Sequence, residues 1–206
     1  MVIAVMASDR QWEELNIDPV KAEWIRVKDM LTFSQNERAD AFINLQEDAA
    51  LFNYSGLQRP VIINSVTKTL QQVQAPANVL RINGWNGFLQ RQVWEVAGIL
   101  DEKTSAVFNA LNKKISPVKD EPGLIAARII AMIINEAYFA LGDNVSSKDD
   151  INTAMKLGTN YPYGPFEWAA IIGLPGILTL LQQLAVTDDR YRPATLLLTE
   201  ATINNS

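Results

Sequence analysis

Apolar residues in the first half of the chain occur in short continuous runs, separated by longer polar stretches. Each run is four or five residues long, and its apolar positions are successive rather than alternate. This pattern is typical of strands covered on both faces, as in a parallel sheet, and the polar stretches have helical length. We therefore predict βα units, with residues 67–73 as one of the helices. The predicted strands are residues 2–6, 24–27, 41–45, 61–64 and 79–82.

The second half of the chain has helical spacing instead. Residues 101–114 form the first predicted helix, with Val107 and Leu111 on one face, and residues 116–122 contain two prolines and are predicted to be a linker. Residues 124–141 are apolar nearly all round, which favours a helix at the centre of a bundle or at an interface. A cap at Ser147 begins a further helix that Gly158 would end, and another helix follows Pro165.

These two patterns divide the 206-residue chain into two predicted domains. Residues 1–118 form an α/β domain with a mostly parallel sheet, and residues 119–206 form an all-α domain. The length is sufficient for each of them to bury a core.

Composition removes several kinds of chemistry. The chain contains no cysteine and no histidine. Disulfides, thiolate nucleophiles, Cys- or His-based metal sites and every Ser-His-Asp arrangement are therefore excluded. Carboxylates alone form no recognisable metal motif, so we expect no metal site.

Charge and hydropathy exclude further classes of partner. The net charge of −5 disfavours nucleic acid, which requires a basic surface. The apolar start, residues 1–7, lacks the positive region of a signal peptide. The most apolar run, residues 168–181, is too short and too interrupted by glycine and proline to span a membrane. We therefore expect a cytoplasmic protein without a membrane segment.

Several separated motifs of the second half resemble, in register, the C-terminal domain of the 3-hydroxyacyl-CoA dehydrogenase family. They lie in residues 120–173, and the tail segment around Tyr191 is similar as well. The motifs are Pro122-Gly123, Asn135-Glu136-Ala137, the run from Ser147 to Ile151, the run from Thr153 to Gly158, and the run from Tyr161 to Glu167.

The first half resembles the same family more faintly, as a shortened Rossmann-like nucleotide-binding domain. Residues 63–67 stand where the family has a Ser/Thr-rich strand end, and residues 82–88 stand over its His-Phe-Phe-Asn-Pro motif. In the family, a histidine of this motif and a glutamate form the catalytic pair. The resemblance places the glutamate at Glu95 and the histidine twelve residues earlier, at Asn83.

The resemblance also identifies other altered positions. An amide at Asn83 cannot act as the base that the family's reaction requires. The family asparagine that holds a substrate oxygen corresponds to Ala127, beside the helical Arg128. Ser65, Thr67 and Arg128 are candidates for the substrate cleft, although Ser65 and Thr67 also fit a role in capping a following helix. Glu95 also fits a surface carboxylate, and Arg128 fits a structural role.

The glycine-rich loop that a dinucleotide requires is missing, because the first glycine of the chain is Gly56. We therefore expect no cofactor-binding residues and no cofactor. The leading hypothesis is a catalytically degenerate relative that acts as a binding or interaction protein. It predicts a homodimer through residues 124–141 and an acyl-CoA-like small molecule as ligand. The alternative is an NAD-dependent oxidoreductase of fatty-acid metabolism whose active site is altered or completed by a partner subunit, so enzymatic activity stays open.

Overall fold

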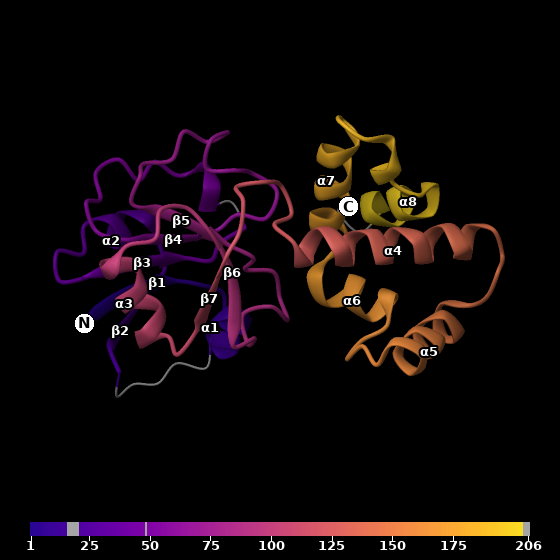
Figure 1. The fold of residues 1–206 in the computed structure, drawn as a ribbon, viewed down its shortest axis with the longest axis horizontal. Coiled ribbons are helices and arrows are strands. Elements are labelled where there is room, and N and C mark those ends of the chain that lie inside the picture. Colours follow the sequence, from indigo (N-terminus) through magenta and orange to yellow (C-terminus); the bar gives the residue numbers. More distant parts are fainter. Residues whose placement is uncertain (16–20, 48, 204–206) are drawn as a thin grey trace. The chain divides into compact units, whose positions relative to one another are not determined.

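The structure is a computed structural model that describes residues 1–15, 21–47 and 49–203. The chain divides into two compact units, Met1–Leu124 and Ile125–Ser206, which we call unit 1 and unit 2 (Figure 1). Unit 1 is an α/β domain with a seven-stranded sheet, and unit 2 is helical. The predicted fold class, a mostly parallel α/β domain followed by an all-α domain, is confirmed.

The sheet of unit 1 has the strand order β2-β1-β3-β4-β5-β6-β7. The first five strands in this order are parallel, β6 is antiparallel to β5, and β7 is parallel to β6. Three of the five predicted strands have the predicted bounds, and the other two differ by one residue at one end. The strands are β1 (Val2–Met6), β2 (Glu23–Val27), β3 (Ala41–Asn44), β4 (Val61–Asn64), β5 (Val79–Ile82), β6 (Val93–Ala97) and β7 (Lys114–Pro117).

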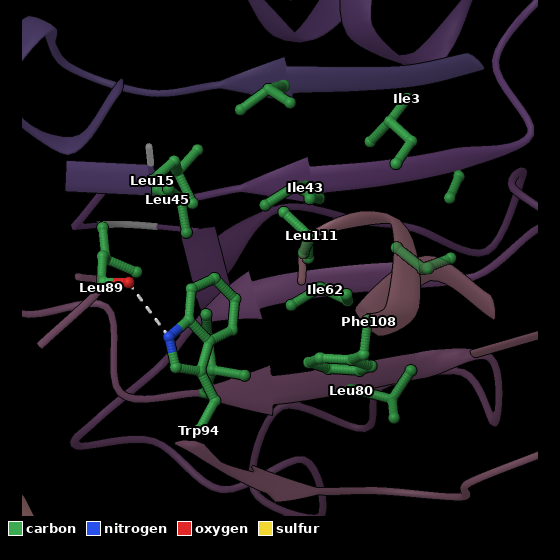
Figure 2. Packing of buried hydrophobic residues seen from close by; sticks show 14 of the residues in the cluster. Ile3, Leu15, Ile43, Leu45, Ile62, Leu80, Leu89, Trp94, Phe108 and Leu111 are labelled. Carbon is green, nitrogen blue, oxygen red and sulfur yellow. Dashed lines mark hydrogen bonds between the residues drawn. The ribbon is translucent and has the colours of Figure 1, made fainter. Parts of the chain in front are cut away.

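Apolar side chains cover both faces of the sheet, which explains the continuous apolar runs. On one face, Ile3 and Ile43 pack with side chains of α1 (Asp9–Leu15) and α3 (Glu102–Ala110) (Figure 2). On the other, Ala4 and Phe42 pack with α2 (Met30–Ser34), the short η1 (Ala49–Leu51) and loop residues. Trp94 packs in the same cluster as Ile3 and Ile43, and its Nε1 donates to the carbonyl of Leu89 at 3.1 Å (Figure 2).

The predicted helix at residues 67–73 is wrong, because this segment consists of turns. Several of its backbone groups bond to partners outside the segment. The N–H groups of Leu70 and Gln71 each donate to the carboxylate of Asp120 at 3.1 Å. The carbonyl of Lys68 accepts from Ser65 Oγ at 2.6 Å and from Arg81 at 3.3 Å. One helix-type i→i+4 bond is present, from the N–H of Val73 to the carbonyl of Thr69 at 3.2 Å, but the bonds to Asp120 and Arg81 take the place of others.

The region between the two predicted domains also differs from expectation. The helix predicted at residues 101–114 begins at Glu102 and ends at Ala110, after which Asn112 takes a left-handed conformation with φ 56°. Lys114–Pro117 then forms β7, which pairs with the open edge of β6, so the first part of the predicted linker is a strand.

Unit 2 contains α4 (Ala126–Gly142), α5 (Lys148–Thr159), α6 (Pro165–Ile172), α7 (Leu174–Ala185), η2 (Asp189–Tyr191) and α8 (Thr195–Ile203). The long helix α4 packs against α6, α7 and α8 (Figure 1). The side chain of Ser147 caps α5 as predicted, but the helix continues through Gly158 and ends where Asn160 is left-handed. Among the described residues, no single helix is long and apolar enough to cross a membrane; α6 and α7 pass that criterion only as a pair, bent by 101°.

Candidate functional site

Three of the predicted site residues lie in one row across neighbouring strands of unit 1. Ser65 and Asn83 directly follow the last facing pair of β4 and β5. The last facing pair of β5 and β6 is Ile82 with Val96, so Asn83 and Glu95 are each the next residue beyond that pair on the two antiparallel segments. The positions at which the family resemblance places the catalytic pair therefore both lie at this end of β5 and β6.

Asn83 is the central residue of this row. Its side chain is 8% exposed, and its Oδ1 accepts the backbone N–H of Trp85 at 3.2 Å. The amide nitrogen Nδ2 is buried and has no hydrogen-bond partner among the described residues. Asn83 is therefore fixed in orientation, with one buried donor that is not satisfied.

Glu95 is half-exposed on β6 and acts electrostatically on Arg91. Burial lowers the pKa of the Arg91 guanidinium, and the charge of Glu95 opposes this shift. The same guanidinium lies over the ring of Phe88, with 4.1 Å between its central carbon and the ring centroid. Glu95 is thus the charge partner of an arginine.

The other two predicted cleft residues of unit 1 differ in their surroundings. Ser65 is buried, and its hydroxyl donates to Lys68 within the turn that replaces the predicted helix. Thr67 is half-buried in the same turn. The hydroxyl of Ser65 therefore stabilises a turn rather than the start of a helix.

A closed ring of hydrogen bonds, the amide ring, joins the carboxyl ends of the strands beside this row. It consists of the side chains of Gln11 and Asn64 and the backbones of Leu45 and Gly84. The carbonyl of Leu45 accepts from Gln11 Nε2 at 2.6 Å and from Asn64 Nδ2 at 3.3 Å. Gly84 donates its N–H to Asn64 Oδ1 at 3.0 Å, and its carbonyl accepts from Gln11 Nε2 at 3.5 Å.

The amide ring lies where an open α/β sheet binds its ligands, at the carboxyl ends of the strands. A dinucleotide needs exposed backbone N–H groups after β1, at the start of a helix. Here Gln11, 7% exposed, accepts the N–H of Ser8 at 3.0 Å, and Asp9 pairs with Arg26 at 2.6 Å. A carboxylate at the start of α1 also disfavours phosphate. These residues do not fit the pyrophosphate of a dinucleotide.

A second acidic side chain of α1 reaches the same region. Both carboxylate oxygens of Glu14 accept the backbone N–H of Gly87, at 2.9 and 2.7 Å. Within the described parts of the chain, no group of three or more acidic side chains is arranged to hold a metal ion.

A buried ion pair stabilises the loops behind the row. Arg81 is fully buried on β5, and its Nε lies 2.5 Å from Asp120 Oδ1. Its other nitrogens donate to the carbonyls of Ser65, at 2.7 Å, and of Glu121. Burial lowers the pKa of Arg81, and the Asp120 carboxylate opposes that shift. The ion pair and these hydrogen bonds connect the loop at Ser65 and the loop at Asp120 to β5.

The two remaining predicted site residues, Ala127 and Arg128, lie on α4 in unit 2. Ala127 is fully buried and offers no polar atom. Arg128 is half-buried, with its guanidinium 6.0 Å from the ring centroid of Tyr191. One helical heptad further, Asn135 holds the segment before α8, because it donates to the carbonyl of Arg192 at 2.9 Å and accepts from Ala194 at 2.8 Å.

Comparison with known proteins identifies unit 2. Residues 123–204 match the model of the 3-hydroxyacyl-CoA dehydrogenase C-terminal domain. Unit 2 thus matches the C-terminal domain of the 3-hydroxyacyl-CoA dehydrogenase family. The 3-hydroxyadipyl-CoA dehydrogenase of Escherichia coli K12 is 49% identical over 87 residues, which are 41% of this chain and 18% of that protein.

Two further relatives extend the match toward unit 1. A 3-hydroxybutyryl-CoA dehydrogenase of Bradyrhizobium diazoefficiens is 34% identical over 143 residues, which are 65% of this chain and 48% of that protein. The crystal structure of an (S)-3-hydroxybutyryl-CoA dehydrogenase from Ralstonia eutropha shares the fold, with a TM-score of 0.74 at 18% identity over 98% of this chain and 94% of that one. The chain thus spans less than half the length of the curated relatives in the family that it matches.

The amide ring could not be predicted from the sequence. One signal was present, because the runs of β3, β4 and β5 are each followed or ended by an asparagine: Asn44, Asn64 and Asn83. Three amides at the carboxyl ends of neighbouring parallel strands lie at one edge of the sheet. The contribution of Gln11 had no comparable signal, since it depends on how α1 packs.

Proposed function

We propose that the chain takes part in the interconversion of 3-hydroxyacyl-CoA and 3-oxoacyl-CoA thioesters in fatty-acid metabolism. In this proposal it is an oxidoreductase-type protein whose active site is altered or completed by a partner subunit. The observation that carries the proposal is the family match at residues 123–204, together with 49% identity to a 3-hydroxyadipyl-CoA dehydrogenase over 87 residues.

Completion by a partner is part of the proposal because of the residues in unit 1. Gln11 and Glu14 occupy the carboxyl edge of the sheet, and Asn83, at the position where the family has its histidine, has no basic nitrogen. A site for the nicotinamide cofactor and a general base would then come from a second protein. Unit 1 would contribute Ser65, Asn83 and Glu95 to holding the thioester substrate.

A second candidate function is favoured by the buried, unsatisfied amide of Asn83 and by the closed amide ring. In this alternative the chain is catalytically degenerate and acts as a dimeric binding or interaction protein with an acyl-CoA-like ligand. A homodimer through residues 124–141 belongs to this candidate. Ile129 on α4 is 52% exposed and is a residue that such an interface would bury.

Two calorimetric titrations, one with NAD and one with a short acyl-CoA, test which ligand the chain binds by itself; both candidates include an acyl-CoA ligand, and the partner-completed enzyme differs from the degenerate binder in the activity that a partner subunit would restore. Binding of acyl-CoA without NAD is expected, since the thioester residues are present while the dinucleotide cradle is not. Binding of both ligands would support an altered enzyme that needs no partner. Binding of neither would contradict the proposal and leave an interaction role.

A rate measurement then tests the assignment of the row. The NADH-dependent reduction of acetoacetyl-CoA is followed by the loss of NADH absorbance, in the chain alone and in Glu95→Gln. If the chain reduces the substrate, Glu95→Gln should lower the rate, and Glu37→Gln, which changes an exposed carboxylate of unit 1, should leave it unchanged. In a chain that reduces the substrate, Asn83→His would supply an imidazole at the position of the family's histidine and should raise the rate by about 100-fold. If Glu95→Gln and Glu37→Gln lowered the rate equally, the assignment of Glu95 to the site would be contradicted.

A further inference from the structure

A cavity in unit 1, which we call the lysine cavity, is lined by cationic and amide side chains. It has a volume of about 580 Å³, and the described residues that line it are Lys21, Gln92, Asn109, Asn112, Lys113 and Lys114. None of these six residues is acidic, although the chain as a whole carries a net charge of −5. Positive charge is thus concentrated at one place on an acidic protein.

Hydrogen bonds bring these residues together from distant segments. Lys114, the first residue of β7, donates its N–H to the carbonyl of Gln92 at 2.8 Å. Lys21 precedes β2, and its Nζ donates to Asn112 Oδ1 at 3.1 Å, where the chain is left-handed after α3. Because the oxygen of Asn112 accepts this bond, its amide nitrogen remains as a further donor. The cavity therefore presents ammonium and amide N–H groups whose positions are set by the fold.

Lys113 is a buried cation to which the described residues supply no countercharge. The residue is 9% exposed, and its Nζ donates to the carbonyls of Leu89 at 2.7 Å and of Arg91 at 3.0 Å. Burial lowers the pKa of this ammonium, and no carboxylate among the described residues opposes that shift. A buried charge without an opposite charge destabilises the folded state. An anion in the cavity would supply the missing negative charge.

The size and the donors of the cavity indicate which anion fits it. A carboxylate carries one negative charge, whereas a terminal phosphate carries a charge of about −2 and three acceptor oxygens at neutral pH. Three separate ammonium groups match the phosphate better, and lysine binds phosphate as a point charge. The volume also falls within the range of about 300–1,000 Å³ that is typical of small-molecule sites. There is thus space for a phosphate together with the organic group that carries it.

We propose that the lysine cavity binds the terminal phosphate group of a small phosphorylated molecule. Lys21 and Lys114 are its cationic contacts, and Lys113 is the buried charge that favours an anion. The inference goes beyond the proposed function and does not depend on it, because that function concerns the thioester end of a substrate.

Calorimetry with inorganic phosphate, at an ionic strength held constant with chloride, tests the proposal. The unaltered chain should bind phosphate, and Lys21→Gln and Lys114→Gln should each weaken binding about tenfold, since each removes a charge-assisted hydrogen bond. Lys28→Gln is the matched control, because this exposed lysine lies directly after β2, whereas Lys21 lies before it. The affinity of Lys28→Gln should be unchanged. No binding by the unaltered chain, or an equal loss in Lys28→Gln, overturns the proposal.

A titration followed by nuclear magnetic resonance tests where the phosphate binds. The side-chain amide resonances of Gln92, Asn109 and Asn112 should shift when phosphate is added. The resonance of Asn53, an exposed amide elsewhere in unit 1, should stay in place. Equal shifts at Asn53 would indicate general binding to the surface and would overturn the proposal.

CoA and dephospho-CoA, which differ only in a terminal 3′-phosphate, distinguish two sources of the phosphate. Displacement of inorganic phosphate by CoA alone would support the proposal with a CoA thioester as the ligand. Displacement by neither would support it with a different phosphorylated molecule. Equal displacement by both would show that a terminal phosphate is not what the cavity recognises, and would overturn the proposal. Absence of phosphate binding overturns this inference alone and leaves the proposed function standing.

Discussion

A single glycine permits the amide ring to close. A Cβ atom at Gly84 would lie 2.7 Å from Cβ and from Cγ of Asn64. Carbon atoms at that distance overlap, so a larger residue must push the Asn64 side chain away from the backbone N–H that it accepts. Asn64 would then lose its place between Leu45 and residue 84. The requirement at Gly84 is steric and does not depend on backbone conformation.

Gly84→Ala should lower the free energy of unfolding by about 2 kcal/mol, from overpacking and from the loss of a buried hydrogen bond. Urea denaturation of unit 1, followed by tryptophan fluorescence, measures this. Gly56→Ala is the matched control, because nothing lies within 4 Å of a Cβ at Gly56. If the two variants had similar urea midpoints, the steric requirement for glycine at residue 84 would be contradicted.

The sequence identified Asn83 as a site position but did not predict that its side-chain nitrogen would be buried without a hydrogen-bond partner among the described residues. The family resemblance identified residue 83 as the position of the base, and in the structure it directly follows β5. The N–H of Trp85 occupies Oδ1 and so fixes the orientation of the amide, and Nδ2 has no partner among the described residues. A property of this kind depends on three-dimensional contacts and could not be read from residue types.

At the scale of elements, the ion pair between Asp120 and Arg81 contributes to the local structure of residues 67–73. Asp120 accepts from Leu70, Gln71 and Arg81, and so connects the turn segment 67–73 with β5. The apolar runs predicted the strands because sheet burial is encoded locally. The turn at 67–73 was missed because its acceptor lies about fifty residues further along the chain.

Asp120→Ala should lower the free energy of unfolding by about 3 kcal/mol, since it leaves the buried guanidinium of Arg81 without its countercharge. The control is Glu23→Ala, which removes the exposed ion pair with Arg38 and should cost less than about 1 kcal/mol. Chemical denaturation measures both. Equal losses would show that Arg81 is not dependent on Asp120.

Glu200 connects three helices of unit 2 and should make its stability depend on pH. Its carboxylate accepts from Tyr138 on α4 at 2.7 Å and from Lys148 on α5 at 2.7 Å. Burial raises the pKa of Glu200, but the hydrogen bonds from Lys148 and Tyr138 outweigh this, and the pKa lies below its ordinary 4.5. A carboxylate with a lowered pKa stabilises the fold above its unfolded-state pKa, and this contribution disappears as the pH falls through the folded-state value.

The measurement compares thermal midpoints of the unaltered chain and of Glu200→Gln across the acid range. The unaltered chain should be more stable at neutral pH, and the difference should narrow below about pH 4.5. A difference that is independent of pH would mean that the charge of Glu200 contributes nothing.

At the scale of the whole molecule, the two units differ in how strongly their sequences match known proteins. Unit 2 carries the strong sequence match, whereas the full-length structural likeness has 18% identity. The fold class of the chain and the family match of unit 2 could therefore be predicted from the sequence, since separated motifs in unit 2 lie in register. What the altered unit 1 binds could not, because its carboxyl edge is built from amides that no motif describes.

The proposed homodimer is tested by light scattering at micromolar concentration. A species of about twice 22.9 kDa is expected for the unaltered chain. Ile129→Lys places a charge on the exposed part of α4 and should shift the protein toward the monomer. Thr153→Lys is the control, as it introduces the same charge on the exposed part of α5. A single 22.9 kDa species for the unaltered chain would contradict the dimer.

The amide ring has a consequence for how unit 1 folds. Its members come from residues 11, 45, 64 and 84, so each bond closes a loop of about twenty residues or more. No local segment can form the ring alone, and it completes only after four neighbouring strands of the sheet, β1, β3, β4 and β5, have assembled. Protection of the Gly84 amide from hydrogen exchange should consequently appear late in refolding, at the same time as the cooperative assembly of the sheet.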